Sequence, residues 1–299
     1  MSQLFDIILH KIDVLTHDER VKLRKHLDSV DDKKKVCDTI EAIQDNQRHC
    51  PHCNNSHIHR HGTDADLQRY KCVTCGKTFN ALTGTPLARL RKKDRWLSYL
   101  SGMNNSDTVR KAADKVHINR KTSFRWRHRF TEWMSINTPK QLTGIVEIDE
   151  TYYRFSEKGD RHLTRKPRKR GSDSTKRGLS KDQVCVLVAC DRSHNDFERV
   201  TGRGPVKGAW LDDHMKGMIP TDAVMVTDGL GSYSHFSKKE NIHHVVVKNE
   251  KGKRKVGCYH IQHVNGYHHR LRDWIIAGFH GVASKNLYHY LSWRHQLEH

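Results

Sequence analysis

Apolar residues recur at two different spacings along the chain, and the spacing changes near Gly144. Before that point they fall three or four positions apart, as on one face of a helix, with an interruption between residues 48 and 82. After it, short apolar runs bounded by turn residues predict strands at Ile145–Tyr153, Val184–Cys190, Phe197–Thr201, Val224–Thr227 and His244–Lys248. Helices are predicted at 210–217, 232–239 and 267–277. Strands followed by alternating strands and helices indicate an α/β domain over residues 143–299, a mixed sheet flanked by helices.

The first 46 residues form a separate, predicted helical segment, in which Phe5 and Ile8 have helical spacing. Thr16-His-Asp-Glu19 has the form of a capping box, in which a threonine and a glutamate three positions later exchange hydrogen bonds at a helix start. Leu23 and Leu27 then lie on one face of the helix that follows. We expect no more of this segment than a helical lead-in or a dimerisation element.

Residues 90–138 predict three short helices. Ser106 and Asn119 are candidate caps for the second and third, and an aromatic stripe from Trp126 to Trp133 gives the third its buried face. Two helices joined by a tight turn resemble a helix-turn-helix, whose second helix enters the major groove of DNA. The alternative is a three-helix core with a solvated basic face. The candidate DNA contacts of the third helix are Arg120, Lys121, Arg125, Arg127 and Arg129.

Four of the eight cysteines form two C-x2-C pairs, separated by 18 residues, within the predicted zinc ribbon at 47–85. A C-x2-C turn lets two thiolates converge on one ion, and Zn²⁺ takes four ligands in a tetrahedron. Four thiolates leave no open position, so we expect a structural ion. Neighbouring histidines can compete as ligands, but the set is complete without them: Cys50, Cys53, Cys72 and Cys75.

The charge of the chain calls for a polyanionic partner. Lysine and arginine number 54 against 34 acidic residues, a formal net charge of +20. The chain has neither an apolar run long enough to span a membrane nor the pattern of a signal peptide at its start, so we expect a soluble, intracellular protein. A segment at 156–182 is almost without apolar residues and predicts a mobile loop suited to phosphates. Its candidate DNA contacts are Lys166, Arg168, Lys169 and Arg170.

Carboxylates interrupt two of the predicted strands. Asp149 and Glu147 share one face of an apolar strand, where a carboxylate is costly to bury without a cation. We interpret Glu147 and Glu150 as edge or surface residues and Asp149 as the one that needs an explanation. Asp228 ends another strand, and alone it is a turn residue. Together with Asp149 it forms the minimal cradle for Mg²⁺, and paired ions of this kind act in phosphodiester chemistry.

A third ligand is expected from the helix that follows. The stretch 260–274 offers His263, Asn265 and His268 but no acid before Asp273. Asparagine before glycine is also a common helix N-cap. Spacing alone leaves the choice open.

Several segments occur together in a recognisable order: Cys50–Cys75, Lys77–Pro86, Thr122–Arg129, Val146–Thr151, Val226–Tyr233, His263–Asn265 and Phe279–Lys285. Over roughly residues 48–295 the chain resembles a family of bacterial insertion-sequence transposases with a zinc ribbon, a helix-turn-helix and a ribonuclease-H-like catalytic domain. The resemblance implies cutting and joining of DNA at the ends of a mobile element. It also implies Asp149 and Asp228 as the first two metal ligands, and a bacterial cytoplasmic, nucleoid-associated protein.

At the third position most such enzymes carry glutamate and some relatives carry asparagine. Asn265 lies 37 residues after Asp228, with Arg272 seven further on, similar to the Asp-Asp-Asn pattern followed by a basic residue. Another register would place His268 there. We prefer Asn265, because a carboxamide oxygen suits Mg²⁺ whereas imidazole prefers softer ions. Arg272 is a candidate for holding DNA near the metals, with a plain surface arginine as the alternative.

The hypothesis from the sequence is therefore a DNA transposase. Residues 48–135 and the basic loop would bind the terminal repeats of the element, and two Mg²⁺ ions would serve phosphodiester cleavage and strand transfer to target DNA. Dimers or larger assemblies are expected, because two ends must be processed together. The alternatives are a DNA-binding regulator with an inert catalytic remnant and a nuclease of the same fold that does not join strands.

Overall fold

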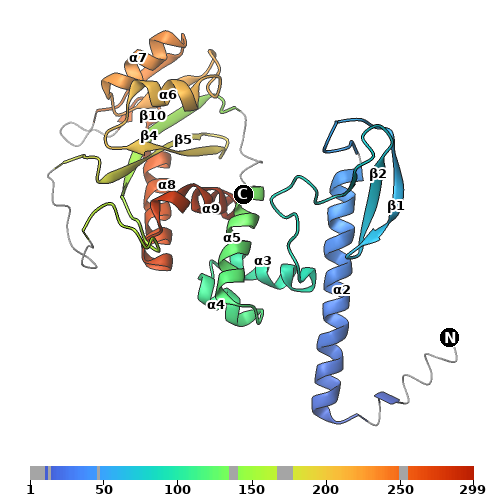
Figure 1. The fold of residues 1–299 in the computed structure, drawn as a ribbon. Helices are drawn as coiled ribbons and strands as arrows, with labels where there is room; N and C mark the ends of the chain where they lie inside the picture. The colour runs from blue at the N-terminus through green and yellow to red at the C-terminus, as the bar shows by residue number, and fades with distance from the viewer. Residues whose placement is uncertain (1–10, 13–14, 46–47, 135–140, 167–177, 249–254) are drawn as a thin grey trace. The chain divides into compact units, whose positions relative to one another are not determined.

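The computed structural model describes residues 11–12, 15–45, 48–134, 141–166, 178–248 and 255–299 (Figure 1). The chain divides into two compact units, Met1–Trp133 and Met134–His299. Phe5 and Ile8 lie outside the described residues. None of the described helices is both long and apolar enough to cross a lipid bilayer.

The first unit begins with a long helix, α2 (His17–Asp45). Its start is the predicted capping box. The Thr16 backbone N–H donates to Glu19 Oε2 over 2.9 Å, and the Glu19 N–H donates to Thr16 Oγ1 over 3.3 Å. That prediction is confirmed. It could be made from sequence because both partners lie within one helical turn and need no distant residue.

A small antiparallel sheet follows, with the order β1-β2-β3: β1 (Ile58–Asp64), β2 (Leu67–Cys72) and β3 (Thr78–Asn80). Its core consists of two of the four clustered cysteines together with Tyr70 and Phe79, whose rings stack with centroids 5.8 Å apart. So few apolar side chains make a weak core for an isolated sheet.

Three helices complete the unit: α3 (Trp96–Asn104), α4 (Val109–Lys115) and α5 (Arg120–Met134), after a short 3-10 helix η1 (Lys93–Arg95). Asn119 caps α5 as predicted, its Oδ1 accepting from the Lys121 N–H over 2.8 Å. The predicted cap of α4 is wrong. Ser106 has a left-handed backbone with φ 56°, and Thr108 takes the role, its side chain accepting from the Lys111 N–H. His117, with φ 51°, makes the turn between α4 and α5 without a glycine.

The second unit is built on a five-stranded mixed sheet with the order β6-β5-β4-β7-β8. Strands β4, β5 and β6 pair antiparallel, while β4 pairs parallel with β7 and β7 with β8. The strands are β4 (Ile145–Arg154), β5 (Gln183–Asp191), β6 (Asp196–Arg203), β7 (Val224–Thr227) and β8 (His243–Val246). All five predicted strands are present, and the α/β class is confirmed, with β4 at the centre of the sheet.

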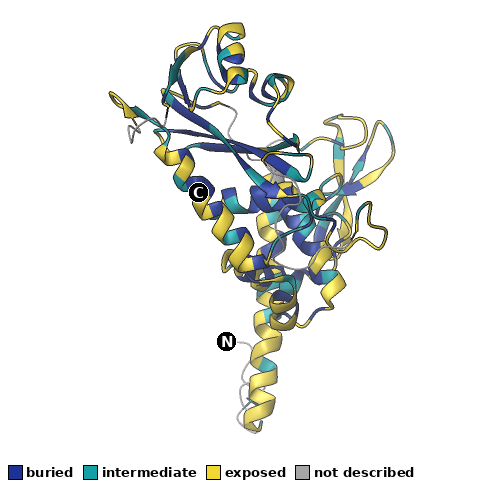
Figure 2. Ribbon diagram, turned by 90° about the vertical axis from the view of Figure 1, so that its left-hand side faces the viewer, coloured by how far each residue is buried: buried dark blue, intermediate teal, exposed yellow. Residues whose placement is uncertain are grey.

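Helices cover both faces of this sheet (Figure 1). One face packs against α6 (Gly208–Met215) and α7 (Gly231–Lys239), around Val146, Leu187 and Met225. The other packs against α8 (Gln262–Asp273) and α9 (Leu287–Glu298), around Val186 and Val188. Figure 2 shows the strands between them as largely buried. The remaining elements are short: β9 (Lys255–Val256), β10 (Tyr259–His260), a π-helical turn η3 (Trp274–Gly278) and a 3-10 turn η4 (Ser284–Asn286).

Candidate active site

Asp149 and Asp228 lie on adjacent strands and on one face of the sheet. The parallel pairing of β4 with β7 aligns Glu147 with Val226. Continued by two residues, the same register brings Asp149 level with Asp228, the first residue after β7. Paired residues of parallel strands point to the same side, so both carboxylates face the layer of α8.

Electrostatics agree with this proximity. The pKa of Asp149 is raised to about 7, chiefly because the carboxyl is buried, with further contributions from the negative charges of Glu150 and Asp228. Burial also raises the pKa of Glu150, although the Tyr233 hydroxyl donates to its carboxylate over 2.5 Å. Within the described ranges, no lysine or arginine forms an ion pair with any of these three carboxylates. Asp149 and Asp228, on one face of the sheet, thus carry negative charge that a cation would neutralise.

The turn after β7 holds Asp228 in place. Its Oδ1 accepts a hydrogen bond from the Leu230 N–H over 3.1 Å, just before α7 begins. Gly229 has φ 95°, and a Cβ there would lie 2.4 Å from Val246 Cγ1. Only glycine fits such a backbone beside β8. The Asp-Gly pair is therefore a turn, as its sequence suggests, and this turn leaves the Asp228 side chain exposed at the end of the sheet.

Helix α8 supplies the residues considered for the third position. It begins at Gln262, five residues before the predicted start, so Asn265 lies inside its first turn and the N-cap alternative is wrong. The Asn265 side chain is exposed, and no hydrogen bond from it to Asp149 or Asp228 is present among the described residues. His268, one turn further on, is buried, with Nδ1 3.7 Å from Asp149 Oδ2. Burial, with the nearby Arg272 charge, lowers its pKa to about 4.

Glu147 determines where α8 begins. It is fully buried in the central strand, and its Oε2 accepts from the backbone N–H groups of His263 over 2.8 Å and Val264 over 3.3 Å. Its Oε1 receives His263 Nδ1 at 2.8 Å and Arg192 Nη2 at 2.9 Å. A carboxylate at a helix N-terminus satisfies free N–H groups and the helix dipole. The interpretation of Glu147 as an edge or surface residue is therefore wrong.

Replacing Glu147 with glutamine is expected to destabilise the second unit by about 2–3 kcal/mol. The NH₂ group of the amide would face the N–H donors that the carboxylate now accepts from. Arg192 and the N–H groups at the start of α8 would then lack a charged acceptor. Urea unfolding of the full chain measures the change in the free energy of unfolding. The matched control is Glu240→Gln at the end of α7, which should change stability by less than about 0.5 kcal/mol. Equal stability of the two variants would contradict the capping role.

Arg272 is exposed but anchored. Its Nη2 donates to Thr151 Oγ1 over 3.1 Å, so its side chain runs back onto β4, two residues beyond Asp149. Three contacts thus run in the same order along α8 and β4: His263 contacts Glu147, His268 lies near Asp149, and Arg272 contacts Thr151. The helix face with the candidate ligands lies along the strand that carries Asp149.

The described part of the basic loop is held in place. Ser156 and Ser284 exchange hydrogen bonds, and Lys158 Nζ donates to the carbonyls of Phe279 and Gly281. The expectation of a mobile loop is therefore wrong for its first residues. Lys166 is exposed. Three other predicted contacts, Arg168, Lys169 and Arg170, lie outside the described residues.

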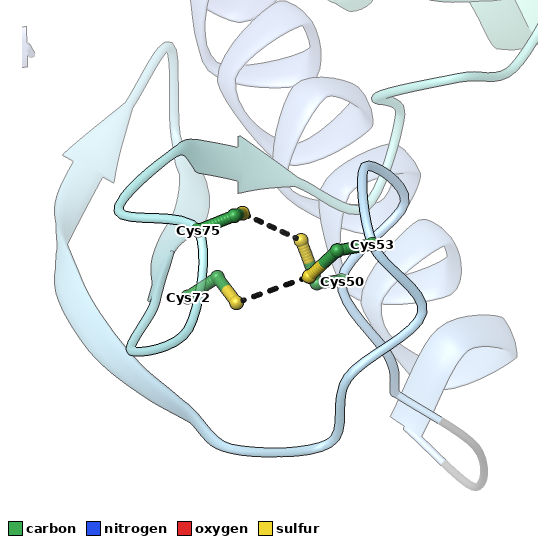
Figure 3. Close-up of side chains that lie close together, drawn as sticks. All are labelled: Cys50, Cys53, Cys72 and Cys75. Carbon is green, nitrogen blue, oxygen red and sulfur yellow. Dashed lines mark hydrogen bonds between the residues drawn. The ribbon is translucent and has the colours of Figure 1, made fainter.

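The four clustered cysteines of the first unit converge on one point (Figure 3). Cys50 Sγ lies 3.6 Å from Cys75 Sγ, and Cys53 Sγ lies 3.6 Å from Cys72 Sγ. Both C-x2-C turns have the same backbone conformation. Asn54 follows the first pair and Gly76 the second, and each donates its N–H to the carbonyl of the first cysteine of its pair. Both residues have a left-handed backbone. A backbone N–H from Cys75 contributes most to lowering the pKa of Cys72 to about 6, which favours the thiolate that a metal binds. The cluster can hold a metal ion.

Helix α5 presents most of its predicted basic face. Arg120, Lys121 and Arg125 are exposed, and Arg129 is half-buried. Arg127 is 1% exposed, and its Nη2 donates to the Asp107 carbonyl over 2.6 Å. The prediction that Arg127 faces DNA is therefore wrong, since it ties α5 to the residues before α4.

A family model for the ISXO2-like transposase domain matches residues 141–294, just over half of the chain. The chain belongs to this family. The transposase domain thus contains the whole sheet, with Asp149, Asp228 and α8. An uncharacterized protein in transposable element ISH50 of Halobacterium salinarum is 25% identical over 249 residues, which are 81% of this chain and 82% of that protein. A chain in the crystal structure of a pre-cleavage Mos1 transpososome aligns with 68% of this chain and 74% of its own length, at 13% identity and a TM-score of 0.25.

Sequence reasoning considered both Asn265 and His268 but missed the parts played by Glu147 and by Tyr233. The one available signal was the alternation of side chains along a strand: Glu147 and Asp149 are two residues apart and share a face, so a buried position for one implied it for the other. The partners of Glu147, Arg192 and α8, are 45 or more residues away in the chain, and no local pattern identifies them.

Proposed function

We propose that this insertion-sequence transposase cuts DNA at the ends of its element and joins the freed strand to target DNA, with a magnesium-dependent site in a ribonuclease-H-like domain at 143–299. The observation that carries the proposal is the placement of Asp149 and Asp228 on one face of adjacent strands. Family membership supports the reaction class, and the mixed sheet with helices on both faces supports the fold assignment.

The chemistry of the carboxylate cluster fits Mg²⁺. Burial and then the charges of Glu150 and Asp228 raise the pKa of Asp149, and no lysine or arginine among the described residues pairs with it. Hard oxygen donors of this kind are what Mg²⁺ prefers. Asp149 and Asp228 would hold the ions, with Asn265 as the third ligand. Bound there, magnesium would activate an oxygen nucleophile and neutralise charge at the phosphate.

The chain itself orients these groups. Tyr233 holds the Glu150 carboxylate on the opposite face of the sheet, so Asp149 alone of the pair faces α8. Glu147 fixes the start of α8 and with it the position of Asn265 along β4. Arg272, held by Thr151, supplies a positive charge one step along the same strand, where a DNA phosphate would lie.

Substitutions can distinguish the two candidates for the third ligand. If Asn265 binds the metal, Asn265→Ala should lower strand cleavage at least about tenfold and Asn265→Asp should retain it, because a carboxylate also donates oxygen to Mg²⁺. His269→Ala, at an exposed position on the same helix, is the matched control. Full activity of Asn265→Ala together with loss in His268→Gln would assign the ligand to His268 instead.

We further propose that the first unit binds the terminal repeats, through a zinc ribbon at 47–85 and a helix-turn-helix at 90–138, after the helical segment at 1–46. The converging cysteines support a structural Zn²⁺, and the exposed arginines of α5 support contact with DNA. Arg168, Lys169 and Arg170 stay predicted contacts of the basic loop. Two or more chains would assemble on DNA, because both ends of an element must be processed together.

A strand-transfer assay tests the proposed reaction. Purified protein is incubated with a pre-cut duplex bearing the end of its own element and with plasmid target, in Mg²⁺ or in EDTA. Joined product in Mg²⁺ alone is the expected result. Hydrolysis without joined product would indicate a nuclease, and binding without either reaction would indicate a DNA-binding regulator.

A further inference from the structure

A second cluster of metal-ligating side chains lies in the second unit, where α9 packs on β6. Asp196 and Glu198 are two apart on β6 and therefore point to the same face, toward α9. His295 lies in the last turn of α9, and His299, four residues later, is its C-cap, with the two ring centroids 4.6 Å apart. Ligand atoms of Asp196, His295 and His299 all lie within 4.8 Å of one another.

In the described part of the chain, one hydrogen bond links this cluster, between His299 Nε2 and Asp196 Oδ1 at 2.5 Å, while the other buried polar atoms converge without one. His295 Nδ1 is 3.1 Å from Asp196 Oδ1 and 3.6 Å from Glu198 Oε2. The direction of the shorter contact is nevertheless unsuited to a hydrogen bond, and His295 Nδ1 and Glu198 Oε2 are both buried atoms without a hydrogen-bond partner. The Glu198 side chain is only 2% exposed and that of His295 6%. Buried polar atoms that point at one another in this way need an ion between them or a shared proton.

The electrostatic environment favours a cation. Among the described residues, no lysine or arginine forms an ion pair with Asp196 or Glu198, so two buried carboxylates face two imidazoles. A second group, Glu147 with His260 and His263, differs on this point. There Arg192 already supplies the positive charge at 2.9 Å, and no metal is needed.

We propose that Asp196, Glu198, His295 and His299 form a second structural metal site, which binds a divalent transition metal such as Zn²⁺ and fastens α9 to β6. Two imidazole nitrogens select such an ion over Mg²⁺. The site is separate from the carboxylate pair at Asp149 and needs no part of the DNA chemistry.

Counting zinc per chain tests the site. The full chain is equilibrated with Zn²⁺, freed of loose metal by gel filtration into excess Mg²⁺, which occupies oxygen-only sites, and analysed for zinc. About two ions per chain are expected, one at the cysteines and one at α9. His299→Gln, at the exposed edge of the cluster, should retain about one. His269→Gln, an exposed histidine of α8, should retain both. Equal zinc contents of His299→Gln and the unsubstituted chain would overturn the proposal.

Cobalt spectra identify which ion is lost and do not depend on the variant folding perfectly. Co²⁺ bound by thiolates gives sulfur charge-transfer bands, whereas a site of nitrogen and oxygen donors gives only the weaker visible bands. The His299→Gln chain titrated with Co²⁺ in excess Mg²⁺ should keep the sulfur charge-transfer bands of the unsubstituted chain, while its visible bands weaken. Visible bands of equal strength in the two chains would show that no metal binds at α9.

Discussion

Replacing Asp149 with asparagine is expected to abolish both cleavage and joining of DNA, by on the order of 10³-fold or more, while DNA affinity is retained. The carboxylate lies on the central strand, level with Asp228, and is one of the two proposed carboxylate ligands of the metal ions. Asparagine keeps the shape of the side chain but removes the charge that would hold the ions. Cleavage of end DNA and gel-shift affinity, measured on the same preparation, check the two halves of this expectation.

The stability of the same variant shows whether lost activity reflects lost folding. Asp149 has a folded pKa of about 7, raised from about 3.9 in the unfolded chain, so the ionised group opposes folding when no cation is present. This penalty is absent below about pH 4, grows from there to pH 7 and is complete above it. In EDTA at pH 8, Asp149→Asn should therefore unfold at a higher temperature than the unsubstituted chain. At pH 4 the two should coincide.

Asp222→Asn is the matched control for Asp149→Asn. Asp222 lies in the exposed turn just before β7, away from Asp149 on the central strand. Its substitution should leave cleavage unchanged. If Asp149→Asn also cleaves normally, the carboxylate pair is not the catalytic site, and the DNA-binding regulator becomes the better description.

Replacing Cys72 with serine is expected to unfold the small sheet of the first unit and to abolish specific DNA binding. Cys72 is fully buried, and its thiolate is one of four proposed zinc ligands around a core of very few apolar side chains. Structural zinc contributes about 10–16 kcal/mol in isolated zinc fingers, which exceeds what such a core supplies. Zinc content, limited proteolysis of residues 48–82 and gel-shift affinity for end DNA measure the loss.

Cys258→Ser serves as the control for Cys72→Ser, since Cys258 is an exposed thiol outside the cluster. It should keep its zinc, its resistance to protease and its DNA affinity. Treatment of the unsubstituted chain with a strong chelator should reproduce the Cys72→Ser result. A ribbon that stays folded and binds DNA without zinc would contradict the metal-dependent account of this unit.

The strands were predictable because a strand that is buried on both faces consists almost entirely of apolar residues. Every residue of β5 after Gln183 is buried, and the run Val184–Cys190 is apolar throughout. The caps at Thr16 and Asn119 were predictable for a related reason, since donor and acceptor lie within three residues. The cysteine quartet is similar, because the turn in each C-x2-C pair is local and only the meeting of the two pairs is tertiary.

What the sequence by itself determined, then, was the class of fold, the positions of the strands, the cysteine cluster and the two aspartates that end on neighbouring strands. The tertiary structure alone decided that Glu147 is buried and caps the start of α8, and that Arg127 is buried instead of facing DNA. It also decided that His268, which the sequence pattern did not favour as a ligand, lies 3.7 Å from Asp149. In each of these cases the deciding partner is 20 or more residues away, and a side chain's environment depends on which distant backbone the fold brings beside it.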